Sequence, residues 1–172
     1  LFWSAGAEVV FGYSAAESLG RTLAELIVPP NVDNPERSVI FDTLANGHAN
    51  YESLRRTKDG TLTYIDSSSK AVRGKDGKAE YILWTKKDVT PLRVTRDAID
   101  KFYGDTGRYP QSVDELVTRR YLRDAPYDPI AQSERSWIVI PPARDAGAEG
   151  ALFDVRSGAQ GASLDGTPYE QW

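Results

Sequence analysis

The sequence of 172 residues contains no cysteine, no methionine and a single histidine, His48. Without cysteine the chain cannot form disulfide bonds, zinc–thiolate sites, c-type haem attachments or cysteinyl–flavin adducts. With one histidine we expect no Ser-His-Asp or Cys-His catalytic unit. His48 follows Asn46-Gly47 in a predicted surface loop, and the alternative role for it is that of a haem ligand.

Long apolar runs are also missing. No stretch approaches the ~20 apolar residues of a transmembrane helix, and no signal peptide is visible. We therefore expect no membrane segment in this sequence. Because methionine is absent, we also expect Leu1 not to be a natural start and the chain to be a fragment or a processed product.

Charge of one sign is not in excess. The formal net charge is −4, and hydrophobic residues make up 40% and charged residues 27% of the chain. Residues 1–92 contain 11 basic and 12 acidic groups, and residues 93–172 contain 10 and 13. Neither half has the basic excess that binding to nucleic acid requires. The composition is that of one large or two small globular domains.

The first half of the sequence predicts short helices followed by an antiparallel meander. Ser14 and Glu17 form a capping-box pattern, and Gly47 ends the longest of these helices. The turns Asp59-Gly60 and Asp76-Gly77 separate runs rich in β-formers, as in hairpins. We expect helices at 8–11, 14–20, 23–27 and 35–46, and strands at 51–57, 61–72 and 80–89.

This half resembles a PAS domain. The resemblance rests on three segments in order: Phe2-Trp3-Ser4-Ala5-Gly6-Ala7-Glu8 with Phe11-Gly12-Tyr13-Ser14, Arg55-Arg56-Thr57-Lys58-Asp59-Gly60, and Lys87-Asp88-Val89-Thr90. It implies a PAS-like antiparallel sheet with short helices over residues 1–90, in which the first strand is missing. We expect residues 1–3 to be the end of a strand. The open sheet edge is expected to pair with another chain, and the alternative is an edge capped by the chain's own C-terminal domain or by solvent.

The second half predicts one long helix and a small sheet. Apolar residues recur with helical spacing from Thr90 to Tyr103 without a flexible linker before them, so we expect a stiff helix that both halves share. A short helix at 113–117 and strands at 137–140 and 152–155 follow.

The second half resembles the globular head of a type II secretion major pseudopilin. The motifs are Asp105-Thr106-Gly107-Arg108-Tyr109-Pro110, Leu116-Val117 with Tyr121-Leu122, Asp128-Pro129, and Phe153-Asp154-Val155-Arg156-Ser157-Gly158 leading to Asp165-Gly166-Thr167-Pro168-Tyr169 and Trp172. The predicted fold class is therefore α+β, with a PAS-like domain at 1–90 and a pseudopilin-like helix with a small antiparallel sheet at 91–172.

A ligand pocket is one hypothesis for the interior of the first domain, because apolar concave sites suit small molecules. The alternative is a core that its own aromatic residues fill. The candidate lining residues are Trp3, Phe11, Tyr13, Phe41, Ile65, Ile82 and Trp84.

Calcium is the one metal that the pseudopilin resemblance suggests, at Asp165 with Ser157 and Thr167. Calcium takes six to eight oxygen ligands, and this loop supplies one carboxylate. The alternative is an Asp-Gly turn that closes the loop by its own hydrogen bonds. We predict no other cofactor and no chromophore.

No enzyme is indicated. Four acidic residues fall in the predicted turns and strands of the meander, where solvated charge is the favoured interpretation: Glu52, Asp59, Asp66 and Asp76. Walker and Rossmann phosphate loops are absent, as are histidine-kinase, cyclase and phosphodiesterase signatures.

The leading functional hypothesis is a sensory or protein-interaction module coupled to the second domain. The alternative is a structural subunit or regulator of a type II secretion or pilus-like filament. We expect a protein partner or a homo-oligomer, with a small-molecule ligand as an open alternative. The two hypotheses differ in location, which is cytoplasmic for PAS signalling and periplasmic or extracellular for pseudopilin assembly.

Overall fold

The computed structural model describes residues 2–143, 147, 149–162, 166 and 168–169. They form two compact units, and the chain passes from the first to the second between Val89 and Thr90. Each unit has a buried apolar cluster of its own. No helix in these residues is long and apolar enough to cross a bilayer.

Four helices begin the first unit: α1 (Ala5–Phe11), α2 (Ala15–Ser18), α3 (Leu23–Ile27) and α4 (Glu36–Asn46). Side chains at their N-termini explain where three of them start. Ser4 accepts a hydrogen bond from the backbone of α1. Ser14 with Glu17 and Thr22 with Glu25 form reciprocal capping boxes on α2 and α3, so both chain segments satisfy their first backbone donors locally.

Three antiparallel strands follow in the order β1-β2-β3: β1 (His48–Arg56), β2 (Leu62–Arg73) and β3 (Ala79–Asp88). This confirms the predicted antiparallel meander. Two expectations were wrong. His48 is the exposed first residue of β1 rather than a loop residue. Phe2 and Trp3 lie in no strand, because the Trp3 indole is instead buried and donates to the Tyr13 carbonyl oxygen at 2.8 Å.

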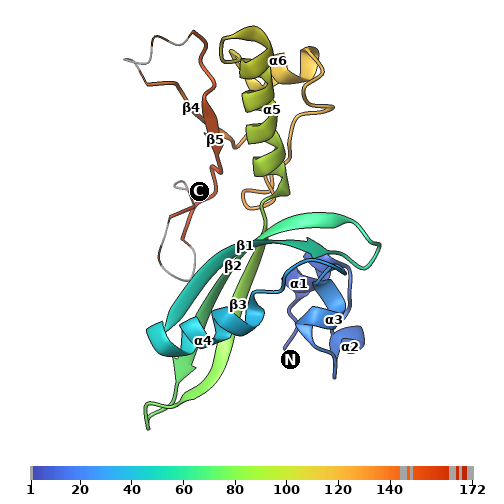
Figure 1. The fold of residues 1–172 in the computed structure, drawn as a ribbon, viewed down its shortest axis with the longest axis vertical. Coiled ribbons are helices and arrows are strands. Elements are labelled where there is room, and N and C mark those ends of the chain that lie inside the picture. The colour runs from blue at the N-terminus through green and yellow to red at the C-terminus, as the bar shows by residue number, and fades with distance from the viewer. Residues whose placement is uncertain (1, 144–146, 148, 163–165, 167, 170–172) are drawn as a thin grey trace. The chain divides into compact units, whose positions relative to one another are not determined.

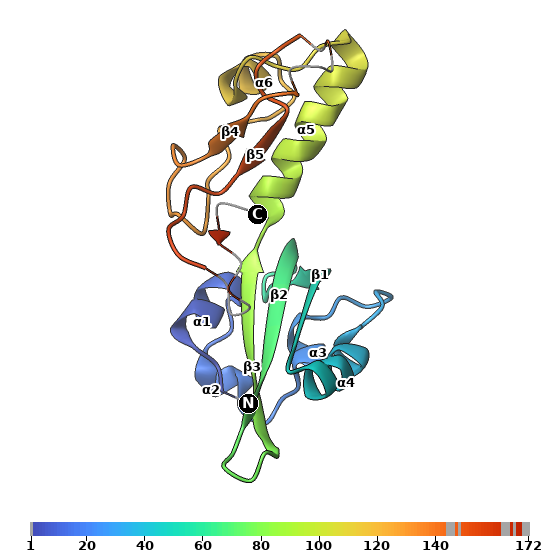
Figure 2. The same ribbon diagram turned by 90° about the vertical axis from the view of Figure 1, so that its left-hand side faces the viewer.

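The face of the sheet that α4 covers is called the inner face. Figure 1 shows α4 lying across the strands, and α4 contacts all three. A hydrogen bond of 2.6 Å joins the buried hydroxyls of Thr43 on α4 and Ser69 on β2. In Figure 2, α1 lies beside β3 and α3 beside β1, as their contacts indicate. An apolar cluster of Trp3, Phe11, Leu26, Ile27 and Ile65 fills the space between these helices and the sheet.

The second unit contains α5 (Thr90–Thr106), α6 (Val113–Thr118), β4 (Ile138–Ile140) and β5 (Asp154–Arg156). A long helix is present where one was predicted, and it runs three residues beyond Tyr103, but it belongs wholly to the second unit and is not shared by both. One side of α5 is buried with α6 and β5 around a core that includes Ile99, Phe102, Leu116 and Val155. Figure 2 shows the antiparallel pair β4-β5 beside α5.

Candidate functional site: polar groups on the inner face of the sheet

Strand register brings polar residues from all three strands of the first unit together. Tyr51 on β1 pairs with Ser67 on β2, which pairs with Lys86 on β3. Directly paired residues of an antiparallel sheet point to the same face. Ser67 is fully buried and lies two residues from Ser69, the contact of α4, so this row lies on the inner face.

Arg55 completes the group, and its side chain is entirely buried. Its Nη2 donates to the Tyr51 hydroxyl at 3.2 Å, and its Nη1 donates to the Leu54 carbonyl oxygen at 3.0 Å. Lys86 Nζ donates to the same tyrosine hydroxyl at 3.4 Å and to the Ser67 hydroxyl at 3.1 Å. Tyr51, Arg55, Ser67 and Lys86 are called the cationic cluster below.

Aromatic rings surround the two cations. The ammonium of Lys86 lies 4.9 Å from the centre of the Trp84 ring and 5.5 Å from that of Tyr51. The Arg55 guanidinium lies 5.8 Å from the Tyr51 ring. The two rings meet edge to face, with centroids 6.1 Å apart. Such contacts attract a cation through the ring quadrupole, but they carry no negative charge.

Electrostatics in the cationic cluster disfavour a full positive charge on Lys86. Burial, followed by the nearby charge of Arg55, lowers the pKa of Lys86 to about 8. Glu36 and Asp66 act in the opposite direction. Burial also raises the pKa of Tyr51, so this phenol stays protonated at neutral pH.

Several buried polar atoms next to the cluster make no hydrogen bond. They include Arg55 Nε, the Ser53 hydroxyl on β1 and Glu36 Oε1 in the first turn of α4. Leaving a buried donor or acceptor unpaired costs about 1–3 kcal/mol. The arrangement therefore presents unused donors and positive charge to the inner face, which is suited to holding an acceptor.

The sequence-predicted pocket residues separate into two groups. Trp3, Phe11 and Ile65 are buried in the apolar cluster, where the Trp3 and Phe11 rings lie 5.7 Å apart, and Tyr13 packs against that cluster. Trp84 instead belongs to the surroundings of Lys86, and Ile82 is half-buried on the same strand. Phe41 is 72% exposed on α4, so it does not line the interior. The helical spacing of α4 turns Val39 and Thr43 inward instead.

The proposed calcium ligands are not assembled in the described residues. Asp165 and Thr167 lie outside them. Ser157 is buried, and its hydroxyl donates to Asp128 Oδ2 at 2.7 Å. Where the structure describes the chain, no three His, Cys, Asp or Glu side chains group closely enough to hold a metal ion.

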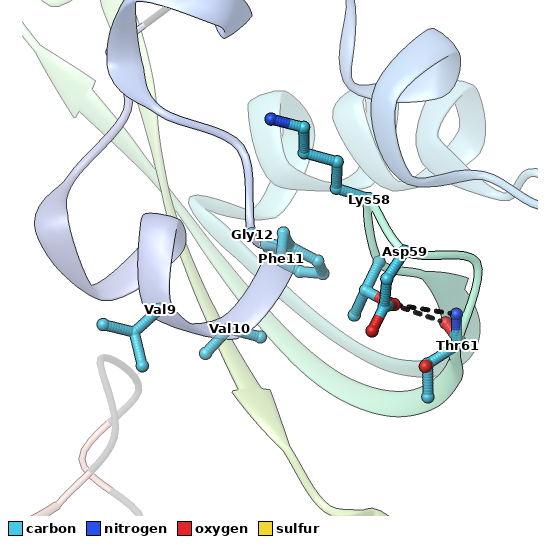
Figure 3. A pocket seen from close by; sticks show the side chains of 8 residues that line it. Val9, Val10, Phe11, Gly12, Lys58, Asp59 and Thr61 are labelled. Carbon is cyan, nitrogen blue, oxygen red and sulfur yellow. Dashed lines mark hydrogen bonds between the residues drawn. The ribbon is translucent and has the colours of Figure 1, made fainter.

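A surface pocket of about 580 Å³ lies between α1 and the turn after β1 (Figure 3). Its polar groups already have local partners. The Asp59 carboxylate accepts from Thr57 Oγ1 and from the Thr61 backbone at 3.0 Å, which lowers its pKa. Lys58 pairs with Glu17. The polar groups of this pocket are therefore less available to bind a ligand than those of the cationic cluster.

Sequence reasoning missed Tyr51, Arg55 and Lys86. The buried Ile65 indicates which positions of β2 face inward, but the residues of β3 around Lys86 show no such alternation. The sequence contains no signal that pairs Ser67 with Lys86 or Tyr51, because register joins residues far apart in the chain.

A family model described as the PAS fold matches residues 1–86, which is half of the chain. The chain belongs to the PAS fold family. The predicted resemblance of the first half is thus confirmed, whereas no comparison supports the pseudopilin resemblance of the second half, which stays a prediction. No curated protein sequence matches the chain.

Solved structures of the same kind cover about half of the chain. One is the PAS domain of a protein from Colwellia psychrerythraea, which is 26% identical with a TM-score of 0.45 and is aligned over 49% of this chain and 72% of its own. Another is the PAS domain of the fruit-fly ELK potassium channel, with 19% identity, a TM-score of 0.44 and coverage of 51% and 72%. A third is the light state of the Aureochrome1 LOV photoreceptor, with 22% identity, a TM-score of 0.44 and coverage of 50% and 67%.

Proposed function

We propose that the chain is a non-enzymatic sensory or interaction module in which a PAS domain at 1–90 acts on a second domain at 91–172. The cationic cluster is the observation that carries this proposal. It gathers buried donors and charge on the inner face of the sheet, in positions suited to a ligand that is held rather than converted.

The junction of the two units supports coupling between them. β3 ends at Asp88 and α5 begins at Thr90, with only Val89 between them. The Val89 amide donates to the Tyr64 carbonyl oxygen of β2 at 2.8 Å, so this residue is tied to the sheet. Leu92 on the first turn of α5 already belongs to the core of the second unit. A change in β3 therefore has three residues to cross, Val89, Thr90 and Pro91, before it reaches that core.

Scanning calorimetry of the full chain tests this coupling. Ile65→Ala removes a fully buried side chain from the first unit, and Leu116→Ala does the same in the second. Each substitution is expected to cost about 2–5 kcal/mol of unfolding free energy. Coupled units unfold in one transition, or in two that both shift with either substitution. Two transitions that respond independently would contradict the proposal. Val9→Ala, at an 86% exposed position, is the control.

The second candidate function is that of a subunit or regulator of a pilus-like filament. One observation favours it: the motif residues on which the pseudopilin resemblance rests contact one another. The Tyr121 hydroxyl donates to Asp105 at 2.9 Å, and the Ser157 hydroxyl donates to Asp128 at 2.7 Å.

Sedimentation velocity at increasing protein concentrations tests the second candidate. A filament subunit is expected to form species that grow with concentration. A sheet whose β3 edge pairs with a second copy is expected to stop at a dimer. A monomer at every concentration would contradict both forms of self-association and leave the coupled module.

A further inference from the structure

We propose that the cationic cluster binds a small monocarboxylate between Arg55 and Lys86, as the ligand of the sensory module proposed above. This inference rests on the proposed sensory function and names the chemical class of the ligand. It is carried by the buried guanidinium of Arg55 and the half-buried ammonium of Lys86, whose described hydrogen bonds go to neutral acceptors.

Both cations have N–H groups that make no described hydrogen bond, and these groups suit the same kind of ligand. Arg55 has its Nη1 and Nη2 engaged by neutral oxygens, while its buried Nε has no partner. The ammonium of Lys86 has three N–H groups, and the described bonds use two of them, to Tyr51 and Ser67. The buried Ser53 hydroxyl adds a further donor. A carboxylate accepts at two oxygens and matches the planar guanidinium fork.

Charge favours an anion with one negative charge. Arg55 contributes one positive charge, Lys86 contributes a second when it is protonated, and Glu36 on α4 acts on Lys86 with one negative charge. Asp66 also acts on Lys86, but it pairs with Lys87 in the row next to Ser67, and successive residues of a strand point to opposite faces. Asp88 also lies on the inner face, because it pairs with Ile65, but its charge is not among those that act on Lys86. One positive charge thus remains at the cationic cluster itself. A monocarboxylate balances it, whereas a phosphate dianion exceeds it.

The packing of α4 over the inner face of the sheet limits the size of the ligand. The α4 residues Val39 and Thr43 are buried, and Thr43 is hydrogen-bonded to Ser69 at the centre of the sheet. A short carboxylate therefore suits this site better than a large planar cofactor. The Trp84 ring beside Lys86 offers apolar surface to the carbon atoms of such a ligand.

Glu36 gives the proposal a second, independent consequence. Its Oε1 is buried without a hydrogen bond, and its charge acts on both Lys86 and Tyr51. A bound carboxylate competes with Glu36 for the same cations. Glu36→Gln is therefore expected to strengthen anion binding while the cations remain in place.

The test is a titration of the full chain with sodium acetate, matched in ionic strength by sodium chloride, and followed by the NMR resonance of the Arg55 Nε–H. Acetate is expected to shift this resonance saturably with a dissociation constant of about 1 mM, as suits a ligand of four heavy atoms. Lys86→Met is expected to weaken binding about tenfold or more, and Glu36→Gln to strengthen it about threefold. Lys70→Met, on the exposed side of β2, is the control and is expected to change nothing.

Three results would overturn the proposal: no shift with acetate, an equal shift with chloride, or tighter binding of inorganic phosphate than of acetate. If Lys86→Met does not fold, the wild-type titration still decides, because it needs no variant. Calorimetric coupling of the two units involves no acetate. If the two units are coupled but acetate does not bind, only the ligand proposal is refuted. If acetate binds but the two units are not coupled, only the sensory coupling is refuted.

Discussion

Asp128 shows how one residue organises an irregular part of the second unit. Its buried carboxylate accepts hydrogen bonds from the backbone of Ile130 and Ala131 at 2.9 and 3.1 Å, and from the hydroxyls of Ser136 and Ser157 at 3.1 and 2.7 Å. Asp128 thereby links the loop that follows it to the end of β5.

Replacing this carboxylate leaves those donors without an acceptor. Asp128→Ala is expected to lower the free energy of unfolding by about 3 kcal/mol or more, because a buried hydrogen-bonded network is broken. Urea denaturation checks the value. Asp124→Ala, four residues earlier and exposed, is the matched control and is expected to change stability by less than about 0.5 kcal/mol. Equal effects of the two substitutions would show that the network does not stabilise the fold.

Lys86 is the residue that predicts a pH dependence. Its pKa is about 8 in the folded chain, below the ordinary value of 10.5, because of burial and of Arg55. Between these two values the unfolded chain binds more protons than the folded chain, so stability rises as pH increases from about 8 toward 10. Below pH 8 the cost of holding a charged Lys86 is present in full.

The measurement is the free energy of unfolding at several pH values from 7 to 9.5, for the wild type and for Lys86→Met. The difference between the two cancels the titration of the other groups. We expect the free energy of unfolding to increase more for the wild type than for Lys86→Met as the pH rises past 8. The range stops at pH 9.5 because burial raises the pKa of Tyr51 in the folded chain. At higher pH the phenol of Tyr51 begins to ionise in the unfolded chain while it stays protonated in the folded chain, which lowers the free energy of unfolding. A flat difference would show that Lys86 titrates normally.

At the scale of the element, α5 combines local and tertiary stabilisation. Leu92, Thr95, Ala98, Ile99 and Phe102 bury one side of the helix. Arg96 on this helix also binds the Asp154 carboxylate of β5 at 2.7 Å. Both kinds of contact keep the backbone helical across exposed positions such as Arg93.

Limited trypsin digestion tests the continuity of α5. Cleavage is expected at Lys75 and Lys78, which are exposed in the turn between β2 and β3, well before cleavage after Arg93 or Arg96. The turn serves as an internal reference in the same digest, with fragments identified by mass spectrometry. Early cleavage within 90–98 into two stable halves would show that α5 does not persist as one helix.

At the scale of the whole molecule, calcium is expected to contribute little stability. The Ser157 hydroxyl already donates a hydrogen bond to Asp128. The loop contains one carboxylate, that of Asp165, which lies outside the described residues. Removing calcium with EGTA is expected to change the melting temperature by less than about 2 °C. Asp165→Ala is the control. A large drop on chelation that this substitution abolishes would show that a calcium site exists.

The helices and strands follow features that are local in the sequence, which is why they could be predicted in outline. Capping boxes at Ser14 and Thr22, the Asp-Gly turns after β1 and β2, and the apolar spacing of α5 each depend on residues within a few positions of one another. Such patterns favour the observed elements locally, in agreement with the packing that stabilises them.

Tertiary structure decided which side chains face inward. Arg55 and Arg56 are neighbours with the same chemistry, yet Arg55 is fully buried, because its pairing with Thr63 places it on the inner face. Phe41 was expected inside and lies outside, because α4 turns Val39 and Thr43 to the sheet. The cationic cluster joins residues 51, 55, 67 and 86 through strand register. No local pattern contains that register, since it depends on the pairing of three strands as a whole.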